Sequence, residues 1–156
     1  MATFVGSYEN KVDAKGRVSV PSRYRAAIDK GAYPGIVIAP SFETGALDAC
    51  DYERITDVAA ALDDPDLYSP EQRLQAEQIL AMSIELPFDD NGRVLIPREL
   101  LDHAGIDGKA LFAGVGPTFQ IWNPKQHAEH KARAMQSVQA AGASLRRLPK
   151  TKTVAS

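Results

Sequence analysis

Two short runs with apolar ends, VSV at residues 18–20 and VLI at residues 94–96, are each followed by a proline. Both runs are rich in β-branched or apolar residues, which is typical of strands. A Lys-Gly pair at 15–16 precedes the first run, and an Asn-Gly pair at 91–92 precedes the second. Asn-Gly between strand-like runs is a strong hairpin signal, because both residues tolerate a positive φ. The pattern predicts a β-hairpin at each place.

The turn and the strand belong to a longer repeat. Residues 13–21, DAKGRVSVP, align with residues 89–97, DDNGRVLIP, which lie 76 positions later. Five of the nine positions are identical, and apolar runs further along the two copies also correspond. We therefore expect two copies of one supersecondary unit.

Each unit is predicted to contain a hairpin, a short helix and two further strands. Pro21 and Pro97 end the strand and suit the start of a helix, whereas Gly105 suits a helix end. The predicted helices cover residues 22–28 and 98–104, and the later strands cover 35–39, 46–49, 110–113 and 118–122.

Helices are also expected between the two units. Residues 52–62 and 70–83 contain good helix formers, and a turn with a proline separates them at 63–66. The apolar stripe expected on the second helix consists of Leu74, Ile79, Ala81 and Met82.

The chain is predicted to end with one more helix and a tail. The helix follows Pro124 and runs to about residue 141, and residues 142–156 are small, polar and basic without periodicity, so we expect disorder there. One face of the helix would carry Ala128, Ala132, Met135 and Val138.

The net charge of −2 hides three charged blocks. Residues 9–25 carry +3, residues 48–77 carry −7, and residues 123–156 carry +6. The charge pattern alone leaves ordinary solvated charge and nucleic-acid binding about equally favoured.

Composition narrows the class of protein. Apolar residues make up 44% and charged residues 24%, which is typical of a soluble globular protein. No signal peptide or membrane-spanning run is visible, and the single cysteine, Cys50, excludes an intramolecular disulfide. We expect a cytosolic protein with Cys50 as a small core residue.

Each repeat places an arginine beside a glycine and four residues after an aspartate. Such an arginine can bond a phosphate or read guanine O6 and N7, and the aspartate could accept its hydrogen bonds and hold it ready. The alternative is that Asp13–Arg17 and Asp89–Arg93 are only salt-bridged turn residues.

The paired motif resembles the MraZ family. The resemblance rests on the two Asp-x-x-x-Arg motifs, on residues 16–21 and 92–97, and on supporting stretches at 9–15, 23–25, 114–116 and 119–122. It covers the chain from about Phe4 to about Arg133, so that only the basic tail lies outside it.

The resemblance implies an α+β fold of tandem SpoVT-AbrB-like repeats, which form a pseudo-symmetric swapped-hairpin β-barrel with flanking helices. The implied parts are a first SpoVT-AbrB-like domain at 7–54, a helical connection at 55–82, a second such domain at 83–126, a C-terminal helix at 127–141 and a basic disordered tail at 142–156.

The resemblance also implies a function. The family is bacterial, cytoplasmic and nucleoid-associated, and it regulates transcription from the promoter of the division and cell-wall gene cluster. The implied partners are double-stranded DNA with repeated promoter elements and further copies of the chain, in a ring-like homo-oligomer where weak contacts add up. No cofactor, metal, membrane or small-molecule substrate is expected.

By resemblance, Arg17 and Arg93 are the residues that touch DNA. The first loop carries Lys15, whereas the second carries the extra carboxylate of Asp90, so we expect the first loop to be the stronger contact. The residues expected to bind DNA are Arg17, Lys15 and Arg93, and those expected to support the loops are Asp13, Gly16, Asp89 and Gly92.

Two rival interpretations stay open. His127 and His130, three residues apart on a predicted helix, could offer metal ligands for a hydrolase, with His103 as the remaining histidine. Alternatively, the chain is an oligomeric scaffold or an antitoxin-like partner-binding module. Surface histidines without a metal are the plainer interpretation, and we do not expect an enzyme. The basic tail could add sequence-independent DNA affinity or be a solvated end.

Overall fold

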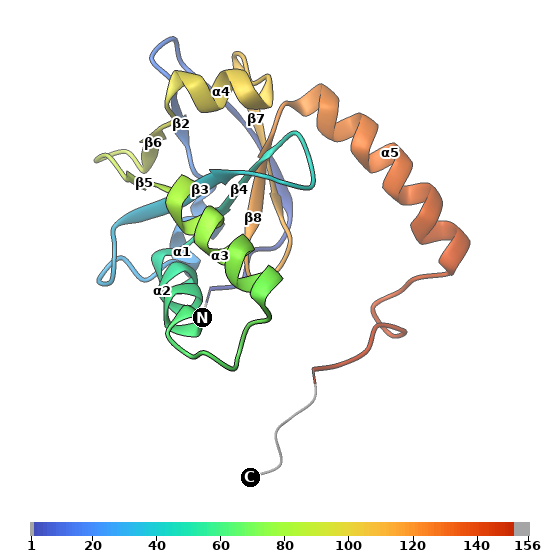
Figure 1. Cartoon of the computed structure of the whole chain (residues 1–156). Coiled ribbons are helices and arrows are strands. Elements are labelled where there is room, and N and C mark those ends of the chain that lie inside the picture. The colour runs from blue at the N-terminus through green and yellow to red at the C-terminus, as the bar shows by residue number, and fades with distance from the viewer. Residues whose placement is uncertain (1, 152–156) are drawn as a thin grey trace. The chain divides into compact units, whose positions relative to one another are not determined.

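The computed structural model describes residues 2–151 (Figure 1). The chain divides into two compact units, residues 1–124 and residues 125–156.

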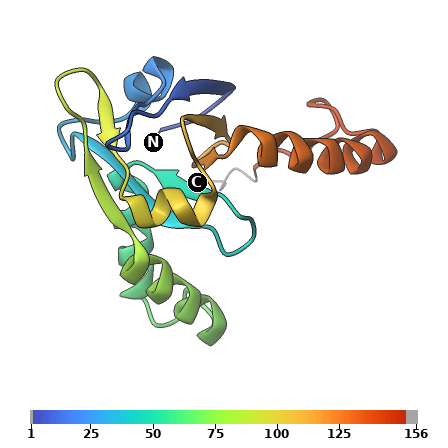
Figure 2. The same ribbon diagram turned by 90° about the horizontal axis from the view of Figure 1, so that it is seen from above.

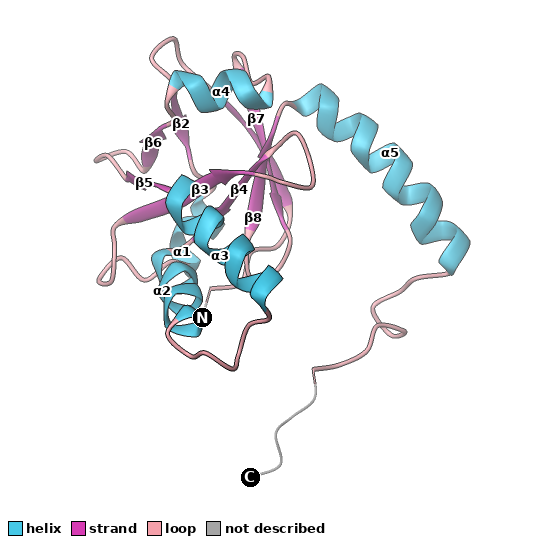
Figure 3. Cartoon of the chain, viewed as in Figure 1, coloured by secondary structure: helices cyan, strands magenta, loops and turns pink. Residues whose placement is uncertain are grey.

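The first unit combines eight strands and four helices within its described residues (Figure 3). The predicted α+β class is confirmed. In chain order the elements are β1 (Ser7–Lys11), β2 (Arg17–Ser19), α1 (Ser22–Ala27), β3 (Gly35–Pro40), β4 (Leu47–Cys50), α2 (Tyr52–Leu62), α3 (Pro70–Met82), β5 (Ile84–Pro87), β6 (Arg93–Leu95), α4 (Arg98–Ala104), β7 (Lys109–Gly114) and β8 (Phe119–Trp122).

Local signals in the sequence fix the ends of several helices. The Asp51 side chain caps α2 by accepting a hydrogen bond from the Arg54 backbone N–H. Ser69 and Gln72 form a reciprocal capping box at the start of α3. Gly105 ends α4 with a positive φ of 65°, which glycine adopts without strain. The predicted positions of helices α1 to α4 are confirmed to within one residue at each end.

The strands of the two repeats interlace. The larger sheet has the order β1-β7-β8-β4-β3-β5, and β2 pairs with β6 in a separate two-stranded ribbon. Exchanging each strand with its counterpart in the other repeat (β1 with β5, β2 with β6, β3 with β7, β4 with β8) reproduces the same order. The first strand of each repeat therefore pairs with the third strand of the other.

This pairing corrects two details of the expected architecture. The strands form two separate sheets, with β1 and β5 at the edges of the larger one, so the described chain contains no closed barrel. The predicted hairpins are also incomplete. At the first turn the flanking strands make only the bridge between Val12 and Val18, because β1 continues along β7 and β2 along β6.

One hydrophobic core joins the larger sheet, the ribbon and helices α1 and α4. Val18 and Val94 from the ribbon are fully buried in it, together with Leu101 of α4. Tyr24 of α1 lies among Phe4, Phe112 and Phe119, and its hydroxyl donates a 2.6 Å hydrogen bond to the Gly6 carbonyl. Because both repeats contribute to this core, neither has a core of its own.

Helices α2 and α3 pack against each other and against β3. The α3 helix is confirmed, but its predicted apolar stripe does not face the core. Leu74 is 62% exposed and Met82 is 40% exposed, whereas Ala76 is the buried residue of the helix. The prediction that this stripe marks the buried face was wrong. Apolar residues lie around the whole of this helix, so part of them remains in solvent.

The second unit contains α5 (Pro124–Ala141) and the chain that follows (Figure 2). The helix is confirmed, and the face with Met135 and Val138 is exposed in the structure. Residues 142–151 form turns and coil, and the rest of the segment expected to be disordered, 152–156, lies outside the described residues. No helix among residues 2–151 has the length and apolar character required to cross a membrane.

The interlaced core makes a prediction about unfolding. Ile38→Val in β3 and Ile121→Val in β8 remove one methylene each from fully buried sites in different repeats. Each should lower the free energy of unfolding by about 0.5–1.5 kcal/mol, and both should shift the same transition, followed by the fluorescence of Trp122, the only tryptophan. Separate transitions for the two variants would contradict a shared core.

Candidate nucleic-acid interface

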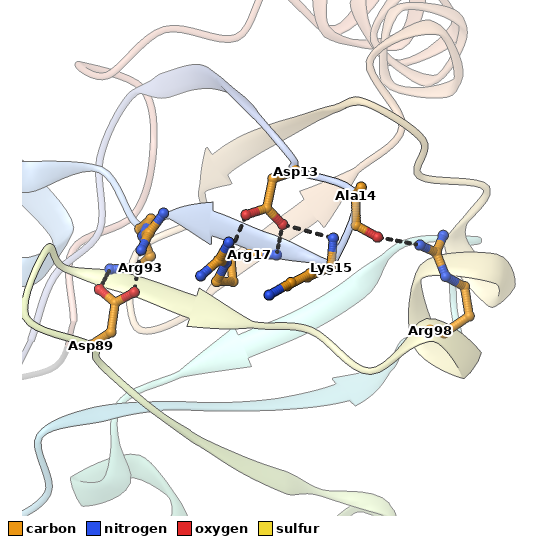
Figure 4. A network of polar contacts seen from close by, with 7 residues as sticks. All are labelled: Asp13, Ala14, Lys15, Arg17, Asp89, Arg93 and Arg98. Atoms are coloured by element: carbon orange, nitrogen blue, oxygen red, sulfur yellow. Dashed lines mark hydrogen bonds and ion pairs between the residues drawn. The ribbon is translucent and has the colours of Figure 1, made fainter.

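The first Asp–Arg turn is organised around the Asp13 carboxylate (Figure 4). Its Oδ1 accepts backbone hydrogen bonds from Lys15 at 3.0 Å and from Arg17 at 2.9 Å. Its Oδ2 accepts a 2.7 Å hydrogen bond from Arg17 Nε. The same carboxylate therefore shapes the loop and orients the arginine side chain.

The second turn repeats this arrangement. Asp89 Oδ1 accepts backbone hydrogen bonds from Asn91 and Arg93, both at 2.9 Å, and Asp89 Oδ2 accepts from Arg93 Nε at 2.9 Å. Gly92 has a positive φ of 74° in this turn, as Gly16 has a φ of 93° in the first. The two motifs found in the sequence are thus the same structure built twice.

The pairing of β2 with β6 brings the two turns together on one ribbon. Val18 and Val94 pair at its centre and are buried, so the alternate positions lie on the opposite, outer face. This outer face consists of Arg17, Ser19, Arg93 and Leu95. The sequence predicted both arginines, but not that they would share a single surface.

Two reciprocal hydrogen bonds fix the turns on the ribbon. The Val20 N–H donates to the Gly92 carbonyl at 3.2 Å, and the Ile96 N–H donates to the Gly16 carbonyl at 3.0 Å. Gly16 must be a glycine here, because an added Cβ would lie 2.7 Å from the Ile96 carbonyl oxygen. Each loop is therefore held by the strand of the other repeat.

The electrostatics of the turns favour ionised aspartates. Backbone hydrogen bonding from Arg17 is the main cause that lowers the pKa of Asp13, and that from Arg93 lowers the pKa of Asp89. The arginine side chains are 38% and 31% exposed, so the ion pairs contribute little stability and act mainly to position the side chains. Among residues 2–151, no acceptor engages the Nη atoms of either arginine.

The remaining predicted loop residue and two further arginines surround the turns. Lys15 is exposed at the tip of the first loop. Arg98 Nη2 donates to the Ala14 carbonyl at 3.4 Å, and the Arg25 guanidinium lies where a side chain on Gly92 would be. Sequence reasoning did not assign Arg25 or Arg98 to the site, because neither belongs to the repeated motif.

The other candidate positions belong to elements other than this ribbon. Cys50 is buried in β4, where burial raises the pKa of its thiol to about 12, so it has the properties of an inert core cysteine. His127 and His130 lie on α5, and burial lowers the pKa of His127. No group of three or more His, Cys, Asp or Glu side chains in residues 2–151 is arranged to hold a metal ion.

Comparison with known proteins finds one matching family model and several similar proteins that share one name. A family model described as "MraZ protein, putative antitoxin-like" matches residues 79–147. The chain is 38% identical to a transcriptional regulator MraZ of Pelagibacter ubique, over 92% of both chains. It is 44% identical to that of Rhodospirillum rubrum, over 80% of this chain and 81% of the relative, and 37% identical to that of Rickettsia akari, over 83% and 87%.

The lowered pKa values predict how the turns respond to pH. Asp13→Asn should reduce the free energy of unfolding at pH 7, because the amide nitrogen cannot accept the Arg17 Nε hydrogen bond. A carboxyl whose pKa is lowered by folding stabilises the protein above its ordinary value of 3.8, and this contribution is lost as the pH falls through the lower folded value. The difference from wild type should therefore shrink in urea titrations as the pH falls below 3.8.

Asp90→Asn is the matched control for this experiment. It removes the carboxylate that follows Asp89 in the second loop, and it leaves the hydrogen-bond acceptors of both arginines in place. A loss in Asp13→Asn that stays constant from pH 7 to pH 2.5 would show that the charge of Asp13 does not hold the turn.

Proposed function

We propose a function for this chain from the premise that it belongs to the MraZ family of transcriptional regulators. In this proposal the chain binds double-stranded DNA through the outer face of the β2–β6 ribbon. The observation that carries the proposal is the register of the ribbon, which brings both motif arginines to one exposed surface. The family is one of transcriptional regulators and not an enzyme family.

The shape of the ribbon suits the major groove. A two-stranded antiparallel ribbon is one of the elements that the major groove of B-DNA admits. Its buried valines attach the ribbon to the core, so the outer side chains would approach the base edges from a rigid support. Asp–Arg loops at both ends of the ribbon would lie near the phosphates.

The chemistry of the arginines supports the same interface. Each Nε is occupied by its aspartate, whereas the Nη atoms remain able to donate to phosphate or to guanine O6 and N7. A side chain that is already oriented loses less conformational entropy on binding. We propose Arg17, Arg93 and Lys15 as the DNA contacts, with Asp13, Gly16, Asp89 and Gly92 supporting them.

The two loops would contribute unequally. Lys15 adds a positive charge at the first loop, whereas Asp90 adds a negative charge at the second. The Arg25 guanidinium lies beside Gly92, where its positive charge would partly offset that carboxylate. We therefore propose the first loop as the stronger contact and Arg25 as a supporting charge for the second.

The regulator would act as an oligomer. One ribbon gives a small interface, so a ring-like homo-oligomer on repeated promoter elements would supply the affinity through many weak contacts. Exposed Leu74, Ile79 and Met82 on α3 provide apolar surface of the kind that contacts between subunits cover. The proposed site of action is the promoter of the division and cell-wall gene cluster, at the nucleoid in the cytoplasm.

The same proposal covers the domain organisation. Residues 7–54 and 83–126 would be two SpoVT-AbrB-like domains in a swapped-hairpin arrangement, joined by the helical connection 55–82. The symmetric strand order supports this division. Residues 127–141 would be a C-terminal helix, with the basic tail 142–156 after it.

A second candidate function is an antitoxin-like module or scaffold that binds a protein partner. The description of the matching family model and the exposed acidic helices α2 and α3 favour it. The two candidates differ in what the ribbon arginines do, because a scaffold would not need them for DNA affinity.

A DNA-binding experiment tests the proposal. Binding to a labelled duplex from upstream of the protein's own gene should be sequence-selective and weaken with salt. Arg17→Ala should weaken binding by about 5- to 150-fold, Arg93→Ala by less, and the double variant should abolish selectivity. Lys15→Ala should reduce the salt slope by about 1.

Arg73→Ala on α3 is the matched control, since it removes one arginine from the acidic helical segment. It should leave the affinity within about twofold of wild type. All variants should keep the native mass of the wild-type oligomer. No selective binding by the intact oligomer would overturn the regulator proposal for this promoter and favour the scaffold.

A further inference from the structure

The two halves of the β2–β6 ribbon are equivalent in geometry but different in chemistry. In the register of the ribbon Arg17 pairs with Leu95, and Arg93 pairs with Ser19. Positions 19 and 95 correspond in the sequence repeat, so each half consists of one arginine and one variable residue. The variable residue is a leucine in the half with Arg17 and a serine in the half with Arg93.

Leu95 is an apolar residue that lies outside the core. It is 54% exposed, whereas its strand neighbours Val94 and Ile96 are each 1% exposed. A Cβ added to Gly16 would lie 3.7 Å from Leu95 Cδ1, so the leucine lies against the loop that precedes Arg17. Its apolar side chain is therefore presented to solvent next to the first Asp–Arg pair.

The chemistry of the major groove offers a ligand for this side chain. Most groups on the base edges there are hydrogen-bond donors or acceptors, and the C5-methyl group of thymine is the apolar one that side chains contact. A leucine can bury this methyl, whereas a serine in its place would offer a hydroxyl that bonds any base.

We propose that Leu95 is a specificity-determining residue that recognises the methyl group of a thymine next to the base contacted by Arg17. The inference rests on the proposed function, because it requires the ribbon to lie in the major groove. Ser19 makes no such contact, so the thymine requirement belongs to the Arg17 half alone.

The test replaces thymine by deoxyuridine, which lacks only the methyl group. In the promoter duplex each thymine position is changed in turn, in all copies of the repeated element, and affinity is measured by fluorescence anisotropy. Wild type should bind about fourfold more weakly when one particular position lacks its methyl. Leu95→Ser, which introduces the residue found at the equivalent position 19, should bind the two duplexes equally.

Val115→Ser is the matched control, because Val115 is 51% exposed in the loop between β7 and β8 and lies outside the ribbon. It should keep the wild-type preference for thymine, and both variants should keep the native mass and the unfolding midpoint of wild type.

The possible failures are distinguishable. If wild type binds selectively but no position responds to deoxyuridine, or if Leu95→Ser keeps the same preference, the role of Leu95 is overturned and the DNA-binding proposal stands. A smaller native mass of Leu95→Ser with an unchanged thymine preference would overturn it too, since Leu95 would then serve a contact between subunits. If wild type does not bind selectively, the proposed function itself fails.

Discussion

The backbone hydrogen bonds from Val20 to the Gly92 carbonyl and from Ile96 to the Gly16 carbonyl connect each ribbon strand to the loop of the other repeat. They require β2 and β6 to be paired, and that pairing requires Val18 and Val94 to be buried in the shared core. The positions of both Asp–Arg turns therefore depend on the packing of the whole first unit. Asp13 and Asp89 shape each turn from within its own repeat, whereas the place of the turn on the ribbon depends on the other repeat.

Different groups stabilise the fold and position the motif arginines. The exposed ion pairs of the turns contribute little to the free energy of folding, whereas the buried aliphatic and aromatic residues of the core supply the apolar burial. The aspartates instead reduce the freedom of the arginine side chains. The surface can therefore vary in chemistry without a large change in the stability of the core.

The sequence predicted most of the elements, because their signals are local: an Asn-Gly turn, prolines after strands, and a glycine at the end of a helix. The repeat also predicted both Asp–Arg pairs. It could not predict that β2 pairs with β6, since pairing between strands 76 residues apart leaves no local pattern. For the same reason Leu95 was not singled out, and Arg25 was not placed beside Gly92.

The interlaced repeats have a consequence for how the surface can evolve. Two separate copies of one repeat could build this ribbon only as a symmetric homodimer, in which every substitution appears twice. In a single chain the equivalent positions change independently. Position 25 is an arginine and its counterpart 101 a buried leucine, and position 19 is a serine where position 95 is a leucine. Covalent linkage has thus released the two halves from identical chemistry while the reciprocal hydrogen bonds retain their common geometry.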